Sequence, residues 1–98
     1  MTNEIVDNPA EQRFETTRDG STAELVYRVH GDRLVLIHTG VPDELGGHGV
    51  GGELVQAALQ RARNEHLTVV PLCPYARHWL ETHPDAIGDV AIDWDLHG

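Results

Sequence analysis

Residues 42–66 read PDELGGHGVGGELVQAALQRARNEH, a loop with five glycines that runs directly into a periodic apolar pattern. In that pattern apolar residues recur every four positions: Val50, Leu54, Ala58 and Ala62. This spacing predicts an amphipathic helix over Glu53–His66, of about four turns. The stretch therefore places a glycine-rich loop at the N-terminus of a long helix, and the remaining elements are arranged around this unit.

Three extended segments precede the loop. The pairs Asp19-Gly20 and Gly31-Asp32 are typical of tight turns, and they separate three segments with strand patterns: Arg13–Thr17, Thr22–His30 and Arg33–Val41. Apolar and polar residues alternate in the second segment, whereas the run Leu34–Ile37 in the third predicts burial on both faces. Three strands joined by two short turns predict an antiparallel meander.

A further strand and a second helix follow the long helix. Leu67–Leu72 is a β-branched run directly after that helix, which predicts a β-α-β crossover and hence a parallel strand. Pro74 suits the first turn of a helix that continues to about Thr82, before Pro84 ends it. The predicted fold class is therefore α+β: a mixed sheet, with an antiparallel meander and then a β-α-β crossover, and two main helices.

Length and composition are those of one small domain. The chain has 98 residues, of which 40% are hydrophobic, and a single cysteine, so an intrachain disulfide is excluded and a cytoplasmic location is expected. We expect a flexible N-terminus over residues 1–12, the folded domain over 13–84 and an acidic C-terminal extension over 85–98, in which 90–94 form one more strand or a docking segment. A monomer is expected, and no apolar run or leader pattern indicates a membrane span or secretion.

The charge balance indicates which kinds of partner the protein attracts. The chain contains sixteen Asp and Glu residues, seven Arg and no Lys, which gives a formal net charge of -9. Such a surface repels phosphate backbones, so nucleic acid is not an expected partner, and it attracts cationic partners such as amines or basic peptides. Acidity that serves solubility alone is the alternative.

The glycine loop predicts an anion site. Backbone N–H groups at a helix start have no intrahelical acceptor, and glycines allow the backbone to approach a phosphate closely. We expect Gly47, Gly49, Gly51 and Gly52 to form a pyrophosphate cradle, with a flexible turn as the alternative. A P-loop is excluded because the chain contains no lysine, and a Rossmann loop because an acidic ribose ligand is missing.

Two segments at this spacing resemble the GNAT N-acetyltransferases. Residues 41–51, VPDELGGHGVG, look like the acetyl-coenzyme A (acetyl-CoA) signature of that family, whose core is Gln/Arg-x-x-Gly-x-Gly/Ala. Residues 70–75, VPLCPY, with Trp79 and His83-Pro84 downstream, are similar to a segment of the small stand-alone GNAT-like proteins. His38-Thr39 and Tyr27 also match that group, and the resemblance extends over residues 14–84.

The resemblance implies a GNAT-like fold, acetyl-CoA or coenzyme A as the cofactor, and a cofactor site with these members: Val41, Gly47, His48, Gly49, Val50, Gly51, Gly52, Pro74 and Tyr75. In that fold the strand before the loop ends with a backbone N–H that binds the thioester carbonyl, which here is the N–H of Val41. One position departs from the motif. Its first residue, usually Arg or Gln, is Gly46, so a side-chain contact with pyrophosphate is lost and His48 is the candidate substitute.

Two residues are the catalytic candidates. Cys73 lies at the start of the second helix, a setting typical of reactive thiols, where it is a nucleophile, a proton donor to the coenzyme thiolate, or a buried core residue. His38, three residues before Val41, is the candidate base or a satisfied sheet histidine. Tyr75 orients substrate or packs in the core with Trp79. No metal-ligand pattern stands out, and no metal is expected.

The predicted function is an acetyl-CoA-dependent N-acetyltransferase that acts on a small-molecule or peptide amine. The alternative is a non-catalytic acyl-CoA-binding or regulatory module on the same fold. Gly46 favours the alternative, whereas Cys73 and His38 favour the enzyme.

Overall fold

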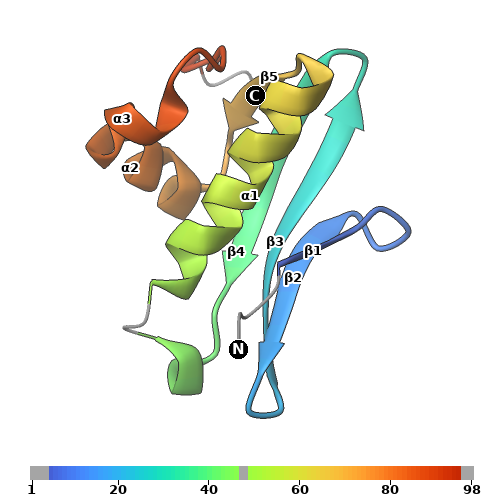
Figure 1. Ribbon diagram of the computed structural model, residues 1–98, viewed down its shortest axis with the longest axis vertical. Coiled ribbons are helices and arrows are strands. Elements are labelled where there is room, and N and C mark those ends of the chain that lie inside the picture. Colours follow the sequence, from blue (N-terminus) through green and yellow to red (C-terminus); the bar gives the residue numbers. More distant parts are fainter. Residues whose placement is uncertain (1–4, 47–48, 96–98) are drawn as a thin grey trace.

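The computed structural model describes residues 5–46 and 49–95. Its sheet has five strands in the order β1-β2-β3-β4-β5, antiparallel from β1 to β4 and parallel between β4 and β5. In Figure 1 the helix α1 crosses the sheet, with α2 and α3 beside it. In chain order the elements are β1 (Val6–Asn8), β2 (Arg13–Arg18), β3 (Ser21–His30), β4 (Arg33–Gly40), the 3-10 turn η1 (Asp43–Leu45), α1 (Val50–Glu65), β5 (Thr68–Pro71), α2 (Pro74–Thr82) and α3 (Pro84–Ile87).

Both predicted turns join strands of the meander. Asp19 and Gly20 have φ of 51° and 80° and connect β2 to β3, where Arg18 pairs with Ser21. A two-residue hairpin turn with positive φ at both positions matches the twist of the flanking strands, and for this reason Asp-Gly is favoured there. The predicted antiparallel meander and the β-α-β crossover are both confirmed, and so is the α+β class.

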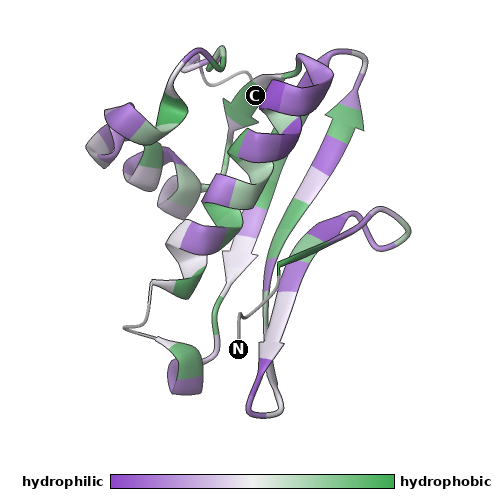
Figure 2. Cartoon of the chain, in the orientation of Figure 1, coloured by the Kyte–Doolittle hydropathy of each residue, from purple (hydrophilic) through white to green (hydrophobic). Residues whose placement is uncertain are grey.

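The core lies between α1 and one face of the sheet. Alternate residues of β3, namely Ala23, Leu25 and Tyr27, are buried against the helix. The helix contributes a stripe of buried residues at three- and four-residue spacing: Leu54, Val55, Ala58, Leu59 and Ala62. Figure 2 shows both hydrophobic and hydrophilic residues along α1, as expected of a helix with one buried side.

The opposite face of the sheet is open, which differs from the prediction for the third strand. Leu34 and Leu36 are buried, but Ile37 is 39% exposed, so the run Leu34–Ile37 is not buried on both faces. The strand register shifts between Val26 and Tyr27, where Tyr27 pairs with Leu36 and Val26 with His38. Ile37 is thus the extra residue of a β-bulge.

Both ends of the chain add to the sheet. Val6–Asn8, within the stretch expected to be flexible, pairs with β2 as an edge strand. At the other end Ile92 bridges Val69 in parallel, so residues 90–94 dock along β5. Arg33 and Asp93 form an ion pair of 2.6 Å beside this contact.

Within the two described ranges, no helix has the length and hydropathy required to cross a membrane.

A buried polar cluster joins β1, β3 and α1. The hydroxyl of Tyr27, a residue 2% exposed, donates a hydrogen bond to Asp7 and accepts one of 2.8 Å from Arg61. Arg61 also forms an ion pair of 3.0 Å with Asp7. Burial raises the pKa of Tyr27 to about 12, and the hydrogen bond to Asp7 adds to the effect. The cluster therefore holds a protonated phenol between opposite charges.

This cluster predicts an alkaline limb in stability. The unfolded phenol ionises near pH 10, whereas the folded one keeps its proton to about pH 12, so stability present below pH 10 is lost as the pH rises from 10 to 12. No lysine titrates in that window. We expect urea unfolding of the wild type to lose up to about 2 kcal/mol across it, and Tyr27→Phe to lose much less while costing about 1–2 kcal/mol at pH 7. Equal alkaline losses in both proteins would contradict this account, and Tyr75→Phe controls for the second tyrosine.

Candidate functional site

The segment between β4 and α1 carries the first part of the site. Val41 follows β4, η1 begins two residues later, and Gly49 precedes the first residue of α1 with φ of 72°. Glycine suits this left-handed position because an L side chain would be strained there. Gly47 and His48, both predicted cofactor residues, lie outside the described residues.

A small cavity opens at the start of α1. It has a volume of about 180 Å³ and is lined by Val41, Leu45, Gly46, Gly49, Val50, Gly51 and Tyr75. The N–H groups of the first helical turn have no intrahelical acceptor, so they favour an anion beside this cavity. The volume suits one part of a coenzyme, since complete ligand pockets run to about 300–1,000 Å³. Five predicted cofactor residues thus meet here: Val41, Gly49, Val50, Gly51 and Tyr75.

Two glycines of the predicted cradle are inside the helix. The helix begins at Val50 rather than Glu53, so Gly51 and Gly52 belong to its first turn and are buried. A Cβ on Gly51 would lie 2.5 Å from the Tyr75 hydroxyl, and one on Gly52 would lie 2.5 Å from Trp79 Nε1. A side chain at either position would displace Tyr75 or Trp79, so the two glycines leave room for α2 to pack closely on α1 even without a ligand.

The parallel strands part beside the cavity. Leu36 of β4 pairs with Pro71, the last residue of β5. The carbonyl of Leu36 then accepts two hydrogen bonds, of 3.0 Å from Leu72 N–H and 2.9 Å from Cys73 N–H. The chain turns into α2 at this point, so Ile37–Gly40 continue without a partner from β5. This unpaired end of β4, beside the gap between the two strands, leads directly into Val41, which lines the cavity.

Cys73 lies at this gap and at the N-terminus of α2. Its residue is 3% exposed and belongs to the hydrophobic core. Its Sγ is 3.2 Å from Oγ1 of Thr39 on β4, which is within hydrogen-bonding distance for sulfur. A polar partner for a buried thiol fits a chemical role as well as a packing one. Thr39 was part of the resemblance to the GNAT-like proteins, but its contact with Cys73 was not predicted.

His38 does not share a site with Cys73. It pairs with Val26 on β3, whereas Thr39 pairs with the buried Leu25. Side chains alternate across a strand, so His38 is on the open face of the sheet and Thr39, with Cys73, is on the face toward α1. The two catalytic candidates are therefore on opposite faces of β4, next to the same gap.

Tyr75 and Pro74 begin α2. Pro74 occupies the first helical position, where a missing N–H costs nothing. Tyr75 is 44% exposed, and its hydroxyl lies over Gly51 at the edge of the cavity. Burial raises the pKa of Tyr75, and the neighbouring Cys73 raises it further. The phenol therefore stays protonated at neutral pH and offers an O–H donor to the cavity.

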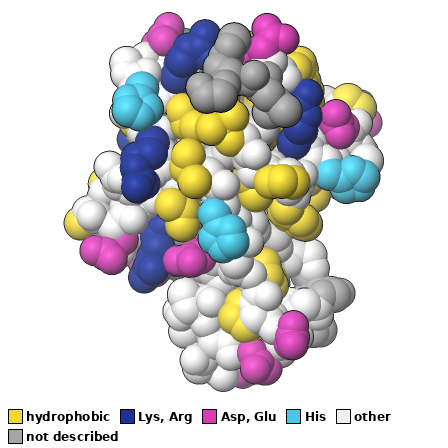
Figure 3. All heavy atoms as spheres, turned by 180° about the vertical axis from the view of Figure 1, so that it is seen from behind, with side chains coloured by type: hydrophobic (Ala, Val, Ile, Leu, Met, Phe, Trp, Pro, Cys, Tyr) yellow, Lys and Arg dark blue, Asp and Glu magenta, His cyan; other side chains and the backbone are white. Residues whose placement is uncertain are grey.

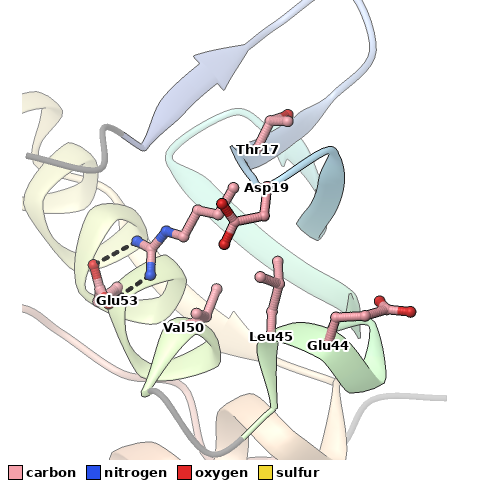
Figure 4. A pocket seen from close by; sticks show the side chains of 7 residues that line it. Thr17, Asp19, Glu44, Leu45, Val50 and Glu53 are labelled. Carbon is pink, nitrogen blue, oxygen red and sulfur yellow. Dashed lines mark hydrogen bonds and ion pairs between the residues drawn. The ribbon is translucent and has the colours of Figure 1, made fainter.

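A larger acidic cavity lies on the other side of η1. It measures about 540 Å³, and Thr17, Arg18, Asp19, Glu44, Leu45, Val50 and Glu53 line it. In Figure 4 Leu45 and Val50 form its apolar side, while Asp19 and Glu53 approach from two different elements. Arg18 donates to both oxygens of Glu53, at 2.9 and 3.3 Å. With its one cation already paired, this cavity repels phosphate, so it is not the anion site.

The sheet is mixed, and its two parallel strands separate beside a glycine-rich helix start. This arrangement is that of the GNAT class of proteins. The sequence profile of the GCN5-related N-acetyl-transferase family matches residues 13–90, and the chain belongs to that family. It is also similar to a GCN5-like protein from Staphylococcus aureus whose solution structure was determined by NMR. The two are 38% identical with a TM-score of 0.73, over 99% of this chain and 96% of the other.

The conformation of Gly49 gives a test of the cavity as a coenzyme site. Apart from Gly49 and its chain neighbours, no described residue has an atom within 4 Å of a Cβ built on Gly49, so a side chain there would extend into open space that a ligand could occupy. We expect Gly49→Val to weaken coenzyme A binding by about 2 kcal/mol or more, measured by calorimetry.

Gly49→Asn separates obstruction from strain, because asparagine tolerates the left-handed conformation. It is expected to bind coenzyme A less tightly while its midpoint of urea unfolding stays near that of the wild type. Full affinity in a folded Gly49→Asn protein would remove this loop from the site.

Proposed function

We propose that the protein binds acetyl-CoA at the start of α1 and transfers the acetyl group to an amine. The observation that carries this proposal is the cavity beside the parted strands, lined by five of the cofactor residues predicted from the sequence. Membership of an acetyltransferase family supports it. The direct experiment is release of free thiol from acetyl-CoA in the presence of a panel of amines, with native mass spectrometry to detect coenzyme that co-purifies.

The residues of the chain have separate tasks in this proposal. Bound acetyl-CoA supplies the thioester whose acetyl group is transferred. N–H groups of the first turn of α1 bind the pyrophosphate, and the N–H of Val41 donates to the carbonyl oxygen as negative charge develops there. His38 accepts a proton from the amine on the open face.

The departing sulfur needs a proton in its turn. The phenol of Tyr75 borders the cavity and stays protonated at neutral pH because burial raises its pKa. Cys73 is the other candidate, or it takes the acetyl group itself before the amine does. Its contact with Thr39 gives the thiol a partner in either role.

A non-catalytic acyl-CoA-binding module is the second candidate function. Gly46 favours it, because a glycine supplies no side chain where the related motif carries Arg or Gln. The residue has φ of -65° and ψ of 150°, a conformation open to any L residue, and an added Cβ would lie 3.4 Å from the Asp43 carbonyl oxygen. The backbone thus permits the missing side chain.

Gly46→Arg is therefore a gain-of-function test. A guanidinium beside the phosphates is expected to tighten coenzyme A binding by roughly tenfold, since a charge-assisted hydrogen bond contributes about 1.5 kcal/mol or more. Calorimetry at two salt concentrations measures the change. Gly46→Gln is the neutral control and should gain less, and an unchanged affinity in both variants would place the phosphates elsewhere.

Substitution of Cys73 separates chemistry from packing. Cys73→Ser keeps the size of the side chain, and Cys73→Ala leaves a small void that costs on the order of 1 kcal/mol. If the thiol is a nucleophile, both variants lose transfer, and a pulse of labelled acetyl-CoA leaves a thioester on the wild type alone. If it is a proton donor, no covalent acetyl forms and turnover falls by roughly 10²-fold. Turnover that follows the folded fraction in both variants would leave Cys73 as a core residue.

A further inference from the structure

On the open face of the sheet, the point above Gly40 at the end of β4 has no side chain of its own and is flanked by two polar side chains; we call this point the recess. A Cβ built on Gly40 would lie 3.5 Å from His38 Nε2 and 3.6 Å from Glu24 Oε2. Glu24 pairs with Gly40 across β3 and β4, so the imidazole and the carboxylate flank the same point. Seen from behind in Figure 3, a histidine and an acidic side chain adjoin the hydrophobic stretch along the middle of this face.

Two polar atoms at this point make no hydrogen bond or ion pair with the described residues. Arg13 binds the other carboxylate oxygen of Glu24, Oε1, at 3.0 Å, which fixes the carboxylate and leaves Oε2 toward the recess. Among the described residues, no hydrogen bond or ion pair uses Glu24 Oε2 or His38 Nε2. A protonated amine needs a hydrogen-bond acceptor that holds it and a base that removes its proton. Glu24 Oε2 and His38 Nε2 are placed to supply the two.

Gly40 supplies space rather than backbone freedom. Its φ is not positive, so an L residue would fit the strand, and a methyl group there would make ordinary contacts. Gly40 borders the recess, and its neighbour Val41 lines the cavity at the start of α1. Consecutive residues, Gly40 and Val41, therefore border the two sites.

We propose that this recess is the acceptor subsite and that it takes a primary alkylammonium, held by Glu24 and deprotonated by His38. The proposal rests on the proposed function. Ile37, 39% exposed, and Val26 on the same face offer apolar contact to the alkyl chain. The net charge of -9 favours a cation. Glu24 is a binding residue in this scheme, and His38 is the catalytic one.

The proposed transfer conserves atoms and charge. The ammonium gives one proton to His38, and the freed lone pair forms a C–N bond with the thioester carbon. The C–S bond breaks, the sulfur keeps the electron pair and takes the proton of Tyr75 or Cys73, and the nitrogen loses its second proton to solvent. His38 then releases its proton and Tyr75 or Cys73 regains one, so the products are the N-acetylated amine, the free coenzyme thiol and one proton released to solvent.

The test measures amine binding apart from turnover. Propylamine and putrescine are titrated into the protein saturated with coenzyme A, and amide shifts are followed by NMR at low and high salt. We expect shifts at Glu24, His38 and Gly40, with an affinity that falls as salt rises. Aniline, uncharged at neutral pH, should cause much smaller shifts. Shifts confined to the acidic cavity at Asp19 and Glu44 would overturn the proposal.

Three variants sharpen the test. Glu24→Gln should weaken amine binding at least fivefold, and Gly40→Ala at least tenfold, with coenzyme A affinity within twofold of the wild type in both. Glu15→Gln is the matched control, since Glu15 pairs with Glu24 across the sheet and binds the same Arg13, and it should change neither affinity. Equal losses in Glu24→Gln and Glu15→Gln would overturn the proposal. Amine binding at the recess with no acetylated product would leave the subsite standing and refute the transferase function instead.

Discussion

The carbonyl oxygen of Leu36 is the point on which the rest of the site depends. It accepts hydrogen bonds from the N–H groups of both Leu72 and Cys73, so the parallel pairing of β4 and β5 ends there and α2 begins at once. If β5 continued in register, its residues would cover Ile37–Gly40 and close the gap. The early turn keeps the end of β4 free on that side and brings Cys73 against Thr39. The close approach of α2 to α1 then follows, and the two glycines of the first helical turn leave room for the Tyr75 and Trp79 side chains.

The sequence was sufficient for β2 to β5 and for α1 and α2, because each of these elements carried a local signal. Asp19-Gly20 fixed a hairpin, the four-residue apolar period fixed α1, and Pro74 fixed the start of α2. The sequence was insufficient for features whose bounds depend on tertiary contacts. The helix start at Val50 depends on the left-handed conformation of Gly49, and an edge strand at Val6–Asn8 depends on pairing with β2.

The candidate site also has parts that the sequence predicted and parts that it did not. The loop, Cys73 and Tyr75 could be found from their pattern, and the structure places them around one gap. The β-bulge at Ile37 could not, because a single extra residue leaves no mark in a run of aliphatic side chains. That bulge sets which face His38 occupies, since a shift of one residue moves a side chain to the other side of a sheet. The proposed role of Glu24 could not be predicted either, because its position beside Gly40 depends on the register of β3 against β4.

The arginine side chains have partners of their own and do not line the cavity at the start of α1. Six of the seven arginines form ion pairs with carboxylates, and they are Arg13, Arg18, Arg33, Arg61, Arg63 and Arg77. The seventh, Arg28, donates to the backbone carbonyl of Tyr27. No arginine lines the cavity at the start of α1, so an anion bound there depends on backbone N–H groups and the helix dipole, whose effect is modest and screened by salt. On the open face, no described residue forms a hydrogen bond or ion pair with Oε2 of Glu24. Under the proposed function, the chain therefore attracts a cationic acceptor by charge and holds an anionic donor mainly by shape and backbone hydrogen bonds.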